Sequence, residues 1–144
     1  MVLALAGTMA FVNTAKAQLR KIPAEVTNAF AEKYADAKNV EWKDVVKAFA
    51  ATFDEDGVKH VARFNKKGEW LSTEKPVEEN DLPEEVKDGL SKSKYSDWEV
   101  KGYYQVQLPS GEVQYRIHVA KSDIQQKNLL FDDNGKLLKD NLTL

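Results

Sequence analysis

The chain has 144 residues, of which 42% are hydrophobic and 31% are charged, and its formal net charge is −2. These values are ordinary for a soluble globular protein of one domain or of two small units that share a core. The charge argues against a nucleic-acid-binding scaffold, which needs a basic patch. The sequence contains no cysteine, which excludes disulfides, thiol nucleophiles, CxxC-type zinc sites and a lipid-modified cysteine.

The first 17 residues have the pattern of a secretory signal. An apolar run from Val2 to Val12 is followed by Ala15-Lys16-Ala17, the small-x-small motif of a signal-peptidase site. The run is shorter than the about 20 residues that a membrane-spanning helix needs. We therefore expect residues 1–17 to be a signal peptide and Gln18 to begin a periplasmic or secreted protein. No Lys or Arg precedes the apolar run, so a buried N-terminal helix stays open as the alternative.

The rest of the chain contains one pattern twice. FNKKGEWL at residues 64–71 returns as FDDNGKLL at residues 131–138, and IPAEV at 22–26 returns as LPEEV at 82–86. Self-similarity over such a distance is typical of a repeated structural unit. We predict a first repeat over residues 18–74, a polar linker over residues 75–81 (KPVEEND), and a second repeat over residues 82–144.

Each repeat is predicted to begin with a helix and to continue as antiparallel strands. Pro23 and Pro83 suit the start of a helix, and Glu25 and Glu84 follow in the first turns, where carboxylates are favourable. After each helix the period of the hydrophobic residues changes from 3.6 to 2, as expected for strands with one apolar and one polar face.

The strands of the second repeat show this alternation most clearly. On the apolar face we expect Trp98, Val100, Gly102, Tyr104, Val106 and Leu108 of one strand, and Val113, Tyr115, Ile117 and Val119 of the next. On the polar face we expect Glu99, Lys101, Tyr103, Gln105 and Gln107, and then Gln114, Arg116 and His118.

The predicted fold class is α+β, with two tandem helix-then-antiparallel-strands repeats merged into one sheet and both helices packed on its apolar face. A single unit of about 60 residues buries too little surface to be comfortably stable, and two units that share a sheet solve this problem. The repeated phrase is then a hairpin turn, in which Phe64 or Phe131 anchors the incoming strand and the glycine supplies a positive φ.

These motifs resemble the PepSY-like, β-lactamase-inhibitor-protein-like exported proteins of Bacteroidetes. The resemblance rests on the proline-to-valine helix openings, the VEWK strand at residues 40–43, the F-x-x-x-G hairpins and the segment TEKPVEENDLPEEV. It covers about residues 19–142. It implies a periplasmic, non-enzymatic protein with tandem α/β repeats, and it carries over no functional residue.

Few residues indicate catalysis or metal binding. His60 is expected at the edge of the apolar face and His118 on the polar face, and neither lies in a catalytic motif. The Asp- and Gly-containing segments 54–57 and 132–135 resemble calcium loops only faintly, and hairpin turns explain them better. We expect Trp42, Trp70 and Trp98 to pack in the core. No catalytic residue, metal or cofactor is predicted.

The remaining candidate is the polar face of the sheet. A partner-binding patch is predicted there, with the residues Lys101, Tyr103, Gln105, Gln114, Arg116 and His118. The favoured function is a monomeric, exported, non-catalytic binding module, an inhibitor-like or sensor protein for a periplasmic or secreted protein. It would bind no nucleic acid and would not insert into a membrane after signal cleavage. The alternative is a small-ligand carrier or an enzyme that uses the same face.

Overall fold

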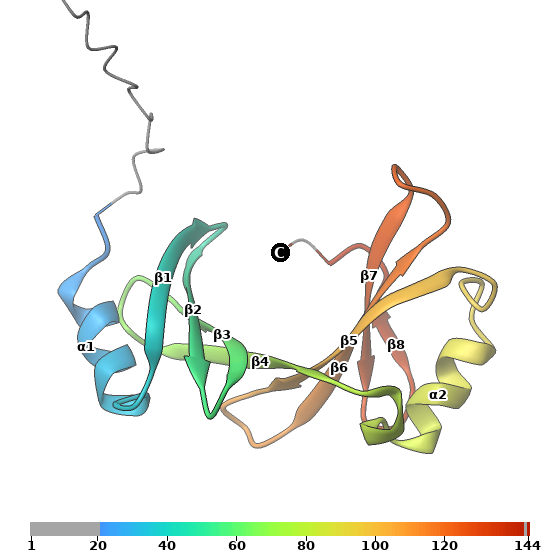
Figure 1. Ribbon diagram of the computed structural model, residues 1–144, viewed down its shortest axis with the longest axis horizontal. Coiled ribbons are helices and arrows are strands. Elements are labelled where there is room, and N and C mark those ends of the chain that lie inside the picture. Colours follow the sequence, from blue (N-terminus) through green and yellow to red (C-terminus); the bar gives the residue numbers. More distant parts are fainter. Residues whose placement is uncertain (1–20, 143) are drawn as a thin grey trace, which may run out of the picture.

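The computed structural model describes residues 21–142 and residue 144. The predicted signal peptide and Gln18 lie outside these residues. Within them, eight strands form one antiparallel sheet in chain order, and two helices lie beside it (Figure 1). The α+β class and the single sheet with helices are as predicted. Neither helix in this part of the chain is long and apolar enough to cross a membrane.

One helix precedes each set of four strands. The first set is α1 (Ala24–Lys33), β1 (Lys38–Val45), β2 (Ala48–Glu55), β3 (Val58–Phe64) and β4 (Trp70–Val77). The second is the short 3-10 helix η1 (Glu79–Asp81), α2 (Glu84–Ser91), β5 (Glu99–Gln107), β6 (Val113–Ala120), β7 (Gln126–Asp132) and β8 (Leu137–Lys139). Pro23 and Pro83 lie immediately before the helices, and the carbonyl of each accepts hydrogen bonds from the first helical turn.

The segment over residues 75–81 belongs largely to regular structure. Residues 75–77 are the end of β4 and pair with β5, and Glu79–Asp81 form η1. The sheet therefore continues without a break from its first four strands to its last four.

Two hydrophobic cores lie on the helix side of the sheet. The first combines Val26 and Phe30 of α1 with buried strand residues, which are Phe49, Ala51, Phe53, Ala62 and Phe64. The second combines Val86 of α2 with Leu82, Tyr95, Tyr115, Ile117, Val119, Leu129 and Phe131. Trp42 and Trp70 pack against the first core and Trp98 against the second, as expected. Strand β4 places both cores on one face, because Thr73, which is hydrogen-bonded to Tyr34 beside the first core, shares its face of the strand with Val77, which contacts the second core.

The repeated phrase forms a hairpin turn in both places, as predicted. Gly68 has φ +83° and Gly135 has φ +82°. A Cβ at Gly68 would lie 2.5 Å from the carbonyl oxygen of Glu25, and a Cβ at Gly135 would lie 1.9 Å from that of Glu85. Each turn therefore presses against the first turn of a helix so closely that only glycine fits.

Strand β5 departs from the predicted alternation. A bulge shifts its register between Val100 and Gly102, which inserts one extra residue and exchanges the two faces from that point on. Val100 packs against the second core as predicted, but so does Tyr103. The assignments of Tyr103 and Gln105 to the polar face, and of Tyr104 and Val106 to the apolar face, are therefore wrong.

Candidate functional site on the open face of the sheet

Among the described residues, no helix lies on the side of the sheet opposite to α1 and α2. Figure 1 shows both ends of the sheet rising on either side of it, with the C-terminal segment ending above it. We call this surface the open face. By strand pairing it comprises Lys43, Ala50, Thr52, Val61, Arg63, Ser72, Glu74, Pro76, Tyr104, Val106, Gln114, Arg116, His118, Asn128 and Leu130.

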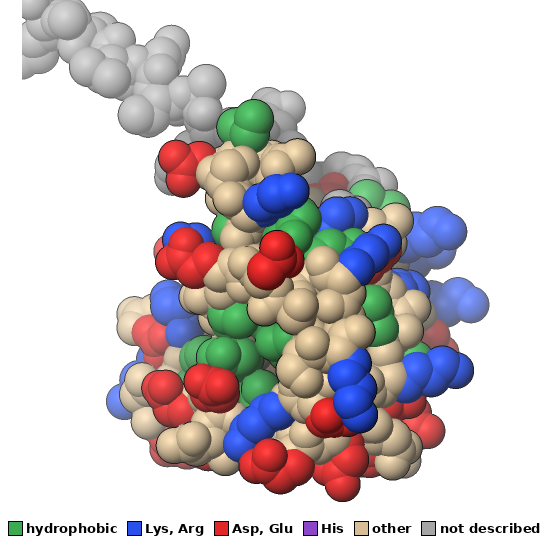
Figure 2. Space-filling model, turned by 90° about the vertical axis from the view of Figure 1, so that its right-hand side faces the viewer, with side chains coloured by type: hydrophobic (Ala, Val, Ile, Leu, Met, Phe, Trp, Pro, Cys, Tyr) green, Lys and Arg blue, Asp and Glu red, His purple; other side chains and the backbone are tan. Residues whose placement is uncertain are grey.

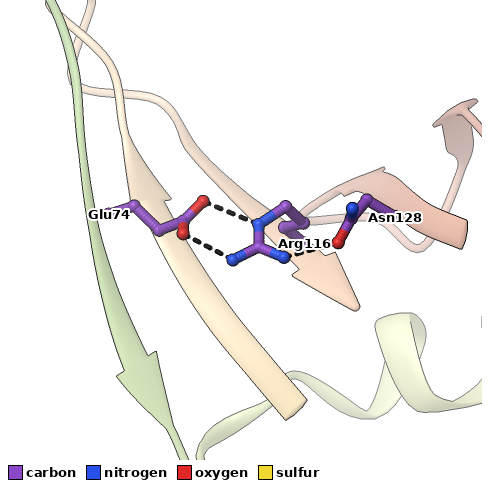
Figure 3. Close-up of polar contacts among 3 residues, drawn as sticks. All are labelled: Glu74, Arg116 and Asn128. Carbon is purple, nitrogen blue, oxygen red and sulfur yellow. Dashed lines mark hydrogen bonds and ion pairs between the residues drawn. The ribbon is translucent and has the colours of Figure 1, made fainter. Parts of the chain in front are cut away.

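A buried ion pair lies at the centre of the open face (Figure 3). Arg116 donates from Nε to Oε2 of Glu74 at 2.8 Å and from Nη2 to Oε1 at 2.6 Å. Its Nη1 donates to Oδ1 of Asn128 at 2.6 Å, and its guanidinium carbon lies 3.8 Å from the ring centroid of Tyr104. The side chains of Arg116 and Glu74 are only 5% and 6% exposed. This bidentate geometry commits both oxygens of the carboxylate to one arginine.

A second arginine on this face has no such partner. Arg63 lies on β3, and within the described residues its guanidinium has no hydrogen bond or ion pair to a carboxylate. Partial burial lowers the pKa of Arg63, the charge of Glu74 opposes this shift, and the charge of Arg116 adds to it. Its guanidinium nevertheless stays protonated at neutral pH, as arginine does in proteins. The centre of the open face thus holds two guanidinium groups and one carboxylate.

A hollow of about 430 Å³ lies over this centre. Its apolar lining comes from Val45, Ala50, Val61, Pro76, Tyr104 and Leu144. Its charged side chains on the open face are Lys43, Lys59, Arg63, Arg116 and Glu74; Lys75 also borders it, but it pairs with Gln105 and its side chain points to the helix side. Four cationic side chains therefore accompany one acidic side chain in this lining, although the chain as a whole has a net charge of −2. One of the four, Lys59, pairs with Asp54 at 3.9 Å.

A smaller hollow of about 240 Å³ adjoins the first and shares Arg63, Glu74 and Leu144 with it. Leu142 of the C-terminal segment lines this second hollow, and its amide donates to the carbonyl of Asn128 at 3.3 Å. The two hollows together make a continuous, partly apolar surface across the middle strands. By contrast, the end of the molecule that carries α2 shows acidic and basic side chains interspersed (Figure 2).

The structure brings only part of the predicted patch together. Gln114, Arg116 and His118 lie on the open face, where Nε2 of His118 is 2.8 Å from Oε1 of Gln126. Lys101 lies at the bulge and pairs with Glu99 at 3.2 Å, with both side chains exposed. Tyr103 and Gln105 lie on the helix side.

The other residues considered for catalysis or metal binding have contacts that explain them as parts of the fold. The ring of His60 stacks on Phe53, with centroids 5.4 Å apart, at the edge of the apolar face as expected. Oδ1 of Asp132 accepts from the amides of Asn134 and Lys136 at 3.0 and 2.9 Å, which is the chemistry of a turn. Within the described residues, no three His, Asp or Glu side chains form a group that could hold a metal ion.

Sequence reasoning missed four residues of this centre: Arg63, Glu74, Tyr104 and Asn128. Arg63 could have been found, because it alternates with the core residues Ala62 and Phe64 and so must point away from them. Glu74 stood at the predicted end of the first repeat, where strand pairing was not expected to continue.

Comparisons with solved structures show where this fold occurs. A Bacteroides eggerthii protein described as periplasmic has a TM-score of 0.72 at 23% identity, over 85% of this chain and 89% of that chain. A DUF2874 family protein from Bacteroides ovatus has a TM-score of 0.70 at 24% identity, over 85% and 88% of the two chains. A BLIP-like protein from Bacteroides fragilis has a TM-score of 0.65 at 23% identity, over 87% and 88%. At these identities the likeness establishes the shared fold.

No curated protein matches the chain. A family model described as beta-lactamase-inhibitor-like and PepSY-like matches residues 47–139, which is more than half of the sequence and extends from the start of β2 to the end of β8. This protein therefore belongs to the PepSY-like, beta-lactamase-inhibitor-like family.

Proposed function

We propose that the protein is an exported, non-catalytic binding module that holds a periplasmic or secreted protein on its open face. The observation that carries this proposal is the hollow of about 430 Å³ over the Glu74–Arg116 pair, on a broad sheet face that no helix of the described residues covers. A stable protein interface buries about 800 Å² on each partner, and a face that extends over the middle strands of a sheet offers this kind of area.

The surroundings of the acid–base groups support binding over catalysis. Both oxygens of Glu74 accept from Arg116, and His118 is paired with Gln126. A general base has to reach a substrate proton within hydrogen-bond distance, and these groups are already engaged by the protein. The fold itself is shared with a BLIP-like protein, which favours the same class of function.

The proposal also includes the location of the protein and the repetition of its two halves. The signal pattern at residues 1–17 and the solved relative described as periplasmic both favour a location outside the cytoplasm. The two halves are proposed to be copies of one helix-plus-four-strand unit. In support, the turns at Gly68 and Gly135 have the same backbone hydrogen bonds and the same contact with a helix start.

The test uses one bulky substitution on each side of the molecule. Thr52→Trp fills the hollow on the open face, and Asn28→Trp adds the same side chain to the exposed surface of α1. Wild type and both variants, checked for equal melting temperatures, are used to capture proteins from periplasmic extract. We expect one partner to be retained by wild type and Asn28→Trp and lost by Thr52→Trp. A partner that is lost only with Asn28→Trp contradicts the proposal.

A further inference from the structure

We propose that the open face recognises an acidic segment of its partner: an Asp or Glu carboxylate pairs with Arg63, and an apolar side chain beside it enters the hollow. This inference rests on the proposed function and gives its partner a chemistry. It starts from the asymmetry of charge, because four cationic side chains and one acidic side chain of the open face line a hollow on a chain of net charge −2. Complementary potentials of this kind select partners of opposite charge and speed their encounter.

The carboxylate of Glu74 pairs with Arg116 and leaves the charge of Arg63 without an ion-pair partner among the described residues. Both of its oxygens accept from Arg116, at 2.6 and 2.8 Å, and its side chain is almost completely buried. Three of the five donors of Arg116 are directed to Glu74 and Asn128. The charges of this pair are therefore matched within the protein, and the pair serves as the floor of the site.

Arg63 is the cation left to receive a ligand. It lines both hollows and so lies where they adjoin. The fork of donors in arginine matches the two oxygens of a carboxylate. Lys43 also lines the hollow and is exposed, and no ion pair to a described residue engages it. It would attract the same negative charge at longer range.

The apolar lining determines what accompanies the carboxylate. Val45, Ala50 and Val61 line the same hollow as Tyr104, whose ring packs on Arg116. An aliphatic or aromatic side chain placed there loses its contact with water without leaving a polar group unpaired. The preferred segment is therefore an acidic residue next to a large apolar residue.

A random peptide library displayed on phage is the probe for this inference. The library is selected against the wild-type protein, and the enriched peptides are retested against Thr52→Trp to identify those that occupy the hollow. We expect these peptides to share an Asp or Glu beside a large apolar residue. In calorimetric titrations, Arg63→Gln should weaken their binding by about tenfold or more, as for other charged pairs that are shielded from water. Lys66→Gln, the same loss of charge in an exposed turn, is the control.

The pairing itself is tested by changing both sides. Replacing the acidic residue of the peptide with Gln or Asn should weaken binding to wild type about tenfold and leave binding to Arg63→Gln nearly unchanged. Hollow-binding peptides without a shared acid, or with affinities insensitive to Arg63→Gln, would overturn the inference and leave the proposed function standing. A selection that yields no peptide blocked by Thr52→Trp contradicts the proposed function and this inference with it.

Discussion

Two arginines on the open face have opposite roles because their surroundings differ. Arg116 is buried and bonded to Glu74 and Asn128, and it joins three strands of the sheet. Arg63 borders the hollows and has no carboxylate of its own among the described residues. Sequence alternation placed Arg116 in the binding patch, whereas its bonds make it part of the structure.

Glu74→Gln should destabilise the protein strongly. The substitution leaves the guanidinium of Arg116 buried without its counter-charge, and breaking a buried pair in this way typically costs about 3–5 kcal/mol. Urea denaturation followed by circular dichroism measures the loss. The double variant Glu74→Leu/Arg116→Met, which removes both charges, should recover most of it. A double variant as unstable as the single one would contradict a role for the uncompensated charge.

The two turn glycines should be less tolerant of substitution than a glycine in an open turn. Gly135→Ala meets both a positive φ and a carbonyl oxygen of α2, whereas Gly111→Ala has φ +87° and no atom within 4 Å of its new Cβ. The left-handed conformation costs about 1–2 kcal/mol in each variant, and the contact should add about 1–3 kcal/mol to Gly135→Ala alone. Urea midpoints that fall equally in the two variants would show that the contact with the helix contributes nothing.

At the scale of elements, the bulge in β5 decides which side chains lie on the open face. Before it, Val100 packs against the second core, and after it Tyr103 does so while Tyr104 faces Arg116. A regular strand would have placed Tyr103 on the open face and Tyr104 in the core. The bulge thus changes which aromatic residue lies on the open face.

Tyr103→Ala should therefore lower the stability of the protein. Tyr103 is partly buried against the second core, so its removal should cost about 1–2 kcal/mol, less than that of a fully buried aromatic residue. Thermal unfolding measures the change, and Gln107→Ala, an exposed residue of the same strand, is the control. A melting temperature unchanged by Tyr103→Ala would contradict the packing of this side chain against the second core.

Strands β5 and β6 show how far the faces of the sheet can be predicted from the sequence. In β6 the alternation of Val113, Tyr115 and Ile117 with polar residues predicted both faces correctly, because one face is packed and the strand is regular. In β5 the same rule failed after Val100, because a bulge depends on long-range pairing and leaves no reliable sign in an alternating strand. The ion pair joins Glu74 of β4 to Arg116 of β6 across the intervening strand β5. No local pattern links residues so far apart in the sequence.

At the scale of the whole molecule, one sheet covers two cores. Each core has its own helix, but β4 pairs directly with β5, and the Glu74–Arg116 pair crosses from β4 to β6. Since the two halves share hydrogen bonds and a buried ion pair, we expect them to unfold together.

Phe64→Ala and Phe131→Ala test this coupling. Both side chains are almost completely buried, in the first and second core respectively, so each change should cost about 3–5 kcal/mol. Tryptophan fluorescence reports each half separately, with Trp98 alone retained for the second core and Trp42 and Trp70 retained for the first. Both reporters should give the same urea midpoint for Phe64→Ala. Separate midpoints would mean that the halves unfold independently.

The location of the partner is the central claim, and the absence of cysteine from the sequence allows a direct measurement of it. A single cysteine is introduced either at Thr52, in the hollow, or at Asn28, on the exposed side of α1. The rate of alkylation of each variant is then measured with and without the partner captured by the wild-type protein. We predict that the partner slows alkylation of Thr52→Cys strongly and leaves Asn28→Cys unchanged. Protection of Asn28→Cys with free reaction of Thr52→Cys would place the partner on the helices and contradict the account.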